Sequence, residues 1–422
     1  MSGFSDKKTK RPELLLPASC PEVLRTAVMY GADAVYIGGD MYGLRAKAKN
    51  FSMPEMAESI AYAHSKGVKV YVTANITAHN RDIEGIKEYF KELSGLKTEN
   101  GADAKPDALI ISDPGVMGLA KEFAPSIDIH VSTQANNVNY LTYRFWQEQG
   151  AKRVVSAREL SIREIKEIRE NIPDDLEIET FVHGAMCISY SGRCLLSNYF
   201  TGRDANLGAC THPCRWKYYV TEETRPGEYL PVFENDRGTY IFNSKDLCMI
   251  EHIPELVDAG IDSFKVEGRM KTALYVAAVA RTYRMALDDY LSDPSLYEAH
   301  LDIYREEIAK CTYRQFTTGF FFDKPDKDAQ IYDNNVYVKD YTYYGFASSV
   351  EDGYAVMEQK NKFLVGDTLE IMRPDGTNTS SQVLEIKNED GEQMESCPHA
   401  GQKIFVRFTE MPAPGEIIRG KV

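Results

Sequence analysis

The residues most able to do chemistry in this chain are four cysteines that share one short stretch. Half of the eight cysteines lie between Phe181 and Trp216, in the segment FVHGAMCISYSGRCLLSNYFTGRDANLGACTHPCRW. Their spacing is C-x6-C-x15-C-x3-C, and Cys248 follows after a further 33 residues. Thiolates bind metals and take part in redox chemistry, so this stretch predicts a metal centre or a redox site.

The cysteine spacing separates the possible sites only in part. Structural zinc sites usually show paired C-x2–4-C motifs, and only Cys210 and Cys214 form such a pair here. A radical S-adenosylmethionine enzyme would need a tighter C-x3-C-x2-C run, which the sequence lacks. Wide spacing is compatible with an iron–sulfur cluster whose thiolates come from separate loops. The residues alone therefore favour a cluster and leave zinc and free thiols open.

Basic and aromatic side chains are interleaved with the same cysteines. Such a mixture suits a phosphate backbone and a stacked base. It is equally compatible with cations that offset four thiolates and rings that pack around them. The net charge of −14 disfavours nucleic-acid binding through bulk charge but allows a local basic surface. The candidate RNA-binding cations are Arg193, Arg203, Arg215 and Lys217.

The rest of the first 290 or so residues alternates apolar strand patterns with helical patterns. Eight such strands separated by helices predict a (β/α)8 barrel, whereas a doubly wound open sheet typically has fewer strands. We expect a basic tail at 1–12 and the barrel at 13–293, with the cysteine loop 185–248 inserted. The strands are expected at 13–18, 33–39, 68–75, 107–114, 128–135, 151–160, 176–184 and 261–269.

Polar residues collect where these strands end. A barrel places its chemistry at the carboxyl ends of its strands, and the cysteine loop leaves the seventh strand at that face. Glu267 and Arg269 are close in sequence, so they could serve a site or form a structural ion pair. The residues at the strand ends are Ser19, Arg45, Asn75, Asp113, Gln134, Arg158, Glu159, His183, Glu267 and Arg269.

The C-terminal part of the chain has a different pattern. A helix and a linker are expected at 294–336, followed by a small all-β, barrel-like domain at 337–422, where short strands alternate with turn motifs such as PDGT. Residues 331–422 carry 9 basic and 15 acidic side chains, a net charge of −6. That balance fits a standalone RNA-binding module poorly and suggests structural support or placement of a substrate.

The composition indicates a soluble globular protein, with 43% hydrophobic and 27% charged residues. No apolar run reaches the roughly 18 residues needed to span a membrane, and the polar start MSGFSDKKTKRPE has no signal-peptide pattern. We therefore expect a cytoplasmic protein without a membrane partner, in a compartment where structural disulfides are rare.

The segment ETFVHGAMCISYSGRCLLS, from Glu179 to Ser197, resembles the signature of the collagenase-like peptidase family U32. The matching features are a glutamate, a phenylalanine two residues on, a glycine, a small residue, an aliphatic residue and a cysteine, followed by Gly-x-Cys-x-aliphatic-Ser. PASCPE (17–22), NSKDLC (243–248) and VEGRMK (266–271) are also similar to the family. The resemblance covers the barrel, and the C-terminal β domain looks like the family's usual appendage.

The resemblance implies a function that the family label does not. Well-understood members are iron–sulfur proteins of RNA or quinone hydroxylation, and this chain looks closest to the branch that makes 5-hydroxyuridine at the tRNA wobble position. It implies tRNA as partner and prephenate as the oxygen source. The strand-end groups expected nearest the chemistry are Arg45, His183, Glu267 and Arg269.

The resemblance also implies a ligand set for a cluster, expected to be of the 4Fe–4S type. Cys187 and Cys194 match the signature cysteines, Cys210 matches the next one, and Cys248 matches the distant one. Cys214 is then a fifth thiol that could replace Cys248.

Two alternatives stay open. One is a peptidase, although the chain contains neither H-E-x-x-H nor G-x-S-x-G. The other is a cluster-holding subunit that acts through a paralogous partner.

Overall fold

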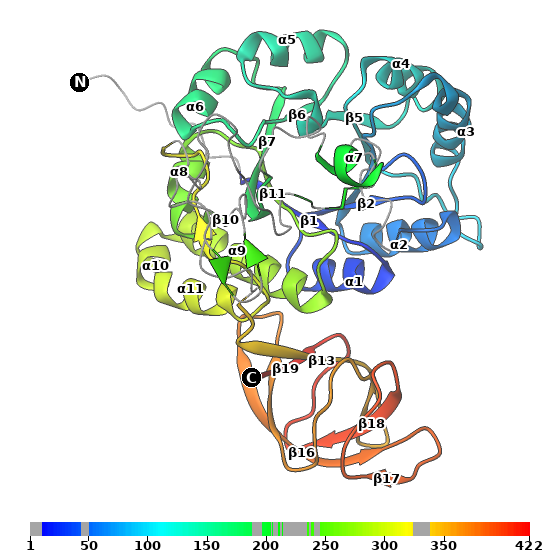
Figure 1. Ribbon diagram of the computed structural model, residues 1–422, viewed down its shortest axis with the longest axis vertical. Coiled ribbons are helices and arrows are strands. Elements are labelled where there is room, and N and C mark those ends of the chain that lie inside the picture. The colour runs from blue at the N-terminus through cyan, green and yellow to red at the C-terminus, as the bar shows by residue number, and fades with distance from the viewer. Residues whose placement is uncertain are drawn as a thin grey trace, which may run out of the picture.

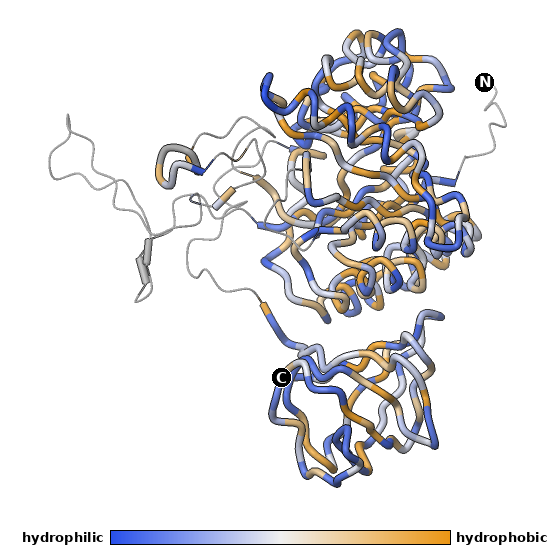
Figure 2. The backbone as a smooth tube through the Cα atoms, turned by 90° about the vertical axis from the view of Figure 1, so that its right-hand side faces the viewer, coloured by the Kyte–Doolittle hydropathy of each residue, from blue (hydrophilic) through white to orange (hydrophobic). Residues whose placement is uncertain are grey.

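The computed structural model describes residues 11–43, 50–187, 196–203, 205, 210, 211, 213, 234–235, 238–239, 245–323 and 338–422. Within this part of the chain, a large barrel with surrounding helices is followed by a smaller β-barrel beneath it (Figure 1). Figure 2 shows the same two bodies side-on.

Eight parallel strands close into the large barrel, which confirms the predicted fold. Neighbouring strands follow one another in chain order from β1 to β7, and the ring is closed because β11 pairs with both β7 and β1. Seven lie inside the ranges expected from the sequence, and β7 extends one residue beyond its expected range of 176–184. They are β1 Glu13–Pro17, β2 Ala34–Gly38, β3 Lys69–Ala74, β4 Ala108–Ile111, β5 Asp128–Val131, β6 Arg153–Val155, β7 Glu177–Ala185 and β11 Ser263–Val266.

Helices connect the strands and cover the outside of the barrel. Ser52 and Ser161 begin two of them with capping boxes, each accepting a hydrogen bond from the backbone of a glutamate three residues on. The helices are α1 Pro21–Met29, α2 Met53–Ser65, α3 Ile83–Ser94, α4 Pro114–Phe123, α5 Tyr140–Glu148, α6 Ile162–Glu170, α7 Leu196–Thr201, α8 Ile253–Asp258, α9 Ala273–Ser292, α10 Pro294–Ala299 and α11 Leu301–Ala309. No helix of the described chain is long and apolar enough to cross a membrane.

Strand β7 departs from a regular barrel strand at its carboxyl end. It is extended there by an antiparallel strand, β10 (Asp246–Cys248), which in turn pairs with β12 (Phe316–Thr317). Against β11, the register of β7 shifts by one residue, because Lys265 pairs with Phe181 but Val266 pairs with His183. The extra residue is a bulge, and a bulge changes the face toward which the following side chain points.

The inside of the barrel holds a buried network of charges. Arg153 Nη1 lies 2.6 Å from Glu13 Oε1 and 3.0 Å from Glu179 Oε2, and its Nη2 lies 2.7 Å from Glu177 Oε2. Lys265 Nζ lies 2.6 Å from the other oxygen of Glu179. The network therefore joins β1, β6, β7 and β11, the strands that flank the closure of the ring.

Glu13 shows how strongly this network holds its charges. Its carboxylate also accepts hydrogen bonds from Tyr71 (2.6 Å) and Ser263 (3.0 Å). Burial by itself would raise the pKa of Glu13, but the charge of Arg153 and these hydrogen bonds hold the pKa below its usual value. Glu13 is thus ionised inside the barrel although it is largely buried.

The smaller domain is a closed antiparallel barrel, as the sequence predicts. Six strands follow the order β15-β19-β13-β14-β18-β16, pairing of β15 with β16 closes the ring, and β17 extends it beyond β16. The bounds are β13 Tyr341–Glu351, β14 Tyr354–Glu358, β15 Thr368–Met372, β16 Asn378–Lys387, β17 Gln393–Met394, β18 Lys403–Phe408 and β19 Ile417–Lys421.

Buried polar contacts fix the small barrel to the large one. The hydroxyl of Tyr30 on α1 donates to the carbonyl of Met372 (2.6 Å) and accepts from the amide of Ile417 (3.0 Å). Glu307 on α11 is clamped between Arg281 of α9 and Arg419 of β19. Because all of these side chains are almost fully buried, the two barrels are held in one arrangement.

Removing the central carboxylate charge should destabilise the large barrel. In Glu179→Gln, Arg153 and Lys265 stay buried and lose the anion that they share. We therefore expect the free energy of unfolding to fall by about 3–5 kcal/mol. Urea unfolding followed by Trp146 fluorescence measures this. Glu88→Gln removes an exposed partner of Lys91 and should change stability by less than about 1 kcal/mol. Equal stability of the two variants would mean that the network does not hold the barrel closed.

Candidate active site at the barrel mouth

Seven of the twelve predicted site residues lie in the described part of the chain. They are Cys187, Cys210, Cys248, His183, Glu267, Arg269 and Arg203. The other five lie outside the described residues, as does the alternative ligand Cys214; they are Arg45, Arg193, Arg215, Lys217 and Cys194.

Arg269 reaches across the mouth from the loop after β11 to the loop that follows β2 and to the end of β3. It donates from Nη1 to Thr73 Oγ1 (3.0 Å) and from Nη2 to Asn50 Oδ1 (2.9 Å). The guanidinium packs so closely on Gly38 that a Cβ there would lie 2.4 Å from Nη2. The side chain is only 4% exposed. A planar fork with several donors fits this position, whereas the single ammonium of a lysine would not.

Glu267 pairs with Arg158 and not with Arg269, so the ion pair considered from the sequence is replaced by another. Arg158 Nη2 lies 3.6 Å from Glu267 Oε2, and its Nη1 donates to the carbonyl of Ala185 at 3.4 Å. Both side chains are only slightly exposed. Close approach of Gly184, where a Cβ would lie 2.4 Å from the carbonyl of Glu267, brings the ends of β7 and β11 together.

Aromatic faces lie beneath these charges. The guanidinium of Arg158 lies 3.9 Å from the centre of the Phe181 ring, and Lys265 Nζ lies 4.6 Å from the Tyr36 ring and 5.5 Å from that of Phe181. A cation and the aromatic ring beneath it attract each other, and they do so more strongly where water is excluded. From the sequence alone, Arg158 is named only as a strand-end residue, and Lys265 and Phe181 are given no role at the site. Phe181 follows Glu179 by two residues on β7 and pairs with Lys265 of β11, so strand alternation could have placed both side chains inside the barrel.

His183 is not at the mouth, which corrects the prediction for this residue. Beyond the β7 bulge its ring points outward, where it packs on Tyr275 and Tyr283 of α9 and on Phe316, with ring centres 5.6–5.9 Å apart. It is 1% exposed. Burial lowers the pKa of His183 to about 3, so the ring is neutral at physiological pH. It is placed as a core residue.

The described cysteines of the predicted ligand set lie in different surroundings. Cys187 is exposed just past the end of β7, and Cys210 is half-buried. Cys210 is next to Thr211, whose amide donates to Ser197 Oγ of α7 at 3.1 Å. Ser197, the last residue of the signature, therefore ties α7 to the segment that contains Cys210. Arg203, just after α7, is exposed.

Cys248 lies on β10 opposite His183. Burial raises the pKa of its thiol to about 12, so a ligand role requires a metal that displaces the proton. Thiols are the donors that iron–sulfur clusters use, and in chemical type the predicted set fits. Among the described residues, no three His, Cys, Asp or Glu side chains lie close enough together to hold a metal ion.

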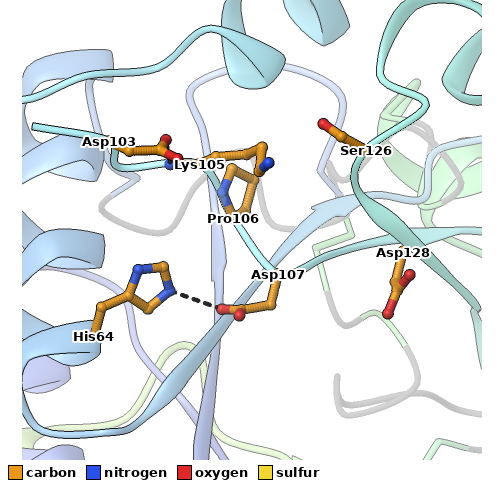
Figure 3. A pocket seen from close by; sticks show the side chains of 7 residues that line it. All are labelled: His64, Asp103, Lys105, Pro106, Asp107, Ser126 and Asp128. Carbon is orange, nitrogen blue, oxygen red and sulfur yellow. Dashed lines mark hydrogen bonds and ion pairs between the residues drawn. The ribbon is translucent and has the colours of Figure 1, made fainter.

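A separate hollow lies at the opposite end of the barrel, where the strands begin (Figure 3). Asp107 accepts there from the backbone amide of Val70 at 2.7 Å and lies 2.9 Å from His64 Nε2. These contacts fix the start of β3 and β4. Barrels place catalytic groups at the other end, so this hollow is not part of the candidate site.

A closed parallel barrel with buried cations and a carboxylate at the carboxyl ends of its strands defines a (β/α)8 protein with a polar mouth. Two family descriptions match the chain: "Peptidase family U32" over residues 20–331 and "Peptidase family U32 C-terminal domain" over residues 339–419. The chain belongs to peptidase family U32, as its signature predicts.

Relatives resemble the chain along nearly its whole length. It is 38% identical over 413 residues to "tRNA hydroxylation protein P1" of Bacillus subtilis (strain 168), covering 97% of this chain and 95% of that protein. It is 38% identical over 448 residues to "tRNA hydroxylation protein P" of Escherichia coli (strain K12), covering 96% and 95%. The solved U32 peptidase Mk0906 shows 15% identity and a TM-score of 0.39, over 64% of this chain and 97% of that one.

The buried neutral imidazole predicts a pH dependence of stability. An unfolded histidine has a pKa near 6.5, whereas that of His183 is about 3 in the folded chain. Between these values the unfolded state binds more protons, so stability falls as pH falls below about 6.5. In the unsubstituted protein, the free energy of unfolding should fall by about 2 kcal/mol between pH 7 and pH 5 because of His183, and we expect His183→Gln to abolish this part of the fall.

Chemical unfolding at several pH values measures this slope. His399 is exposed, and His399→Gln should leave the pH profile unchanged. A His183→Gln profile parallel to that of the unsubstituted protein would show that the imidazole is protonated or solvated in the folded state.

Proposed function

We propose that this protein is a tRNA-modifying enzyme that converts a uridine, the wobble uridine, to 5-hydroxyuridine. The observation that carries the proposal is the likeness over more than nine-tenths of the chain to proteins named for tRNA hydroxylation. The barrel supports it because its strand ends offer a mouth of cations, the Glu267 carboxylate and aromatic faces. We place the activity in the cytoplasm, with tRNA as the partner.

The mouth supports binding of an anionic co-substrate. Replacing C5–H of uridine by C5–OH inserts one oxygen atom and removes two electrons from the base. We propose prephenate as the donor, which would lose that oxygen atom and take up the two electrons. Guanidinium groups pair bidentately with carboxylates, and Arg158 and Arg269 are held from opposite sides of the mouth. Phe181 and Tyr36 offer flat surfaces for a ring. In this scheme Glu267 balances the charge of Arg158.

We propose that Cys187, Cys194, Cys210 and Cys248 hold an iron–sulfur cluster of the 4Fe–4S type. When bound, it would supply electron-transfer or Lewis-acid chemistry near the mouth. The residues of this chain have separate tasks: the arginines orient the anion, and the buried strand ends exclude water. A paralogous subunit acting together with this chain is the alternative arrangement, and its test is whether the purified single chain is active.

A deletion strain tests the function, and Arg269 tests the site. Nucleoside mass spectrometry of tRNA from a strain lacking the gene should show no 5-hydroxyuridine, and the intact gene should restore it. Arg269→Lys should fold and yet restore less than about a tenth of the 5-hydroxyuridine. One ammonium cannot replace a guanidinium that donates to both Thr73 and Asn50 and would also pair with a carboxylate.

The matched control is Arg305→Lys, at an exposed arginine that pairs with Glu251 and Asp302. It should restore full modification. Normal 5-hydroxyuridine in the deletion strain would overturn the proposed function. Full modification by Arg269→Lys would remove only that residue from the site, and loss of soluble protein would assign it a structural role.

The cysteine ligands predict iron content. Cys187→Ser, Cys194→Ser and Cys210→Ser should each lose most of the iron when purified without oxygen, because serine does not replace a thiolate. Comparison of Cys248→Ser with Cys214→Ser then assigns the fourth ligand. Cys20→Ser is the control, because Cys20 is the N-cap of α1, a position that serine favours. Unchanged iron in all three signature variants would contradict the proposed cluster.

A further inference from the structure

The outer face of the small barrel carries aromatic side chains that its core does not need. Strands β14, β18 and β16 pair side by side, and their inward positions are filled by buried apolar residues. Because side chains alternate along a strand, the next positions point to solvent. Tyr354 and Phe405 stand there, each partly exposed. An exposed sheet face usually carries small polar or charged residues, so two rings at its centre call for a role.

Three cations surround these two rings. Lys387 Nζ lies 4.3 Å from the centre of the Tyr354 ring, and the guanidinium of Arg407 lies 5.9 Å from the same centre. Lys403 Nζ lies 5.4 Å from the Phe405 ring. We call these five residues the aromatic-basic face. Arg407 is 49% exposed, and its Nη1 lies 3.8 Å from Glu385 Oε2, so a partner can reach the guanidinium although its charge is partly balanced.

The acids on this face are already engaged. Glu385 accepts hydrogen bonds from Tyr354 (2.7 Å) and Gln393 (2.6 Å), and these hold its pKa below the usual value. Glu358 lies 2.9 Å from Lys360. Glu385 also lies 3.5 Å from Lys387 and 3.8 Å from Arg407, so this one carboxylate is shared by two of the three cations and the face keeps an excess of positive charge within an acidic domain.

We infer that the aromatic-basic face binds a single-stranded or loop segment of the RNA substrate. The inference rests on the proposed function and adds a second contact, remote from the mouth. Rings stack on bases of any sequence, and nearby cations neutralise the phosphates that flank a stacked base. A protein partner would be expected to meet a more apolar centre with fewer charges.

The position of the face agrees with a remote contact. The small barrel packs on the large one through residues of β13, β15 and β19, including Tyr343, Met372 and Ile417, which belong to the core of the large barrel. Strands β16 and β18 lie at the end away from that contact (Figure 1). The face is therefore uncovered by the rest of the described chain and can receive part of a long nucleic acid whose other end enters the mouth.

The test is tRNA binding by full-length variants at several salt concentrations. The face variant combines Phe405→Ala, Lys403→Ala and Arg407→Ala. It should bind tRNA about tenfold or more weakly, because stacking on one base and two phosphate contacts are lost. The slope of log affinity against log salt should become shallower by about 1.5 to 2. Lys339→Ala with Lys421→Ala removes two exposed cations elsewhere in the domain and should change affinity much less.

Three other outcomes would overturn the inference: unchanged affinity and salt slope in the face variant, an equal loss in the control variant, or loss of a co-purifying protein while tRNA binding is intact. The circular dichroism spectrum and melting temperature of each variant check folding, and Phe405→Tyr, which keeps the ring, should retain binding if stacking is the cause. Normal 5-hydroxyuridine in the deletion strain would defeat the proposed function itself, which separates the two failures.

Discussion

The barrel depends on a set of charges that it has removed from water. Arg153 and Lys265 share the buried carboxylate of Glu179, and Glu13 completes the set from the first strand. Buried charges are tolerated only when they are paired and hydrogen-bonded, so the four strands that contribute them must meet in one register. This requirement also fixes the floor of the mouth, because Lys265 is bound to Glu179 on one side and lies over Tyr36 and Phe181 on the other.

The same logic continues upward to the rim. Each guanidinium at the mouth is tied to another strand. Arg158 is bound to the end of β7 and to Glu267, and Arg269 is bound to Thr73 on the far side of the opening. These contacts join segments that are remote in sequence. They hold the charged groups without the mobility that surface arginines have, and preorganised charges lose less entropy when a ligand binds.

Periodicity in the sequence was sufficient to locate all eight barrel strands and the small β domain, because apolar runs bounded by turns report burial directly. It could not give features that arise only from long-range pairing. The bulge that turns His183 outward depends on β11, more than 80 residues away, and Glu267 pairs with Arg158 from the segment after β6 and not with a residue of its own loop. The signature pointed to the cysteines and to the family, but Cys194 and the alternative ligand Cys214 lie outside the described residues.

The closure of the ring has a consequence for how the chain folds. Glu13 meets Ser263 across 250 residues of sequence, so the first strand has no partner on one side until most of the barrel has been synthesised. Contacts of such separation are slow to form and leave strand edges exposed in the meantime. During translation β1 can pair only with β2, and the buried charge of Glu13 is neutralised only after β6 has followed. The nascent chain therefore passes through a stage in which an open, parallel sheet is exposed to other chains, and chaperones would meet this protein at that stage.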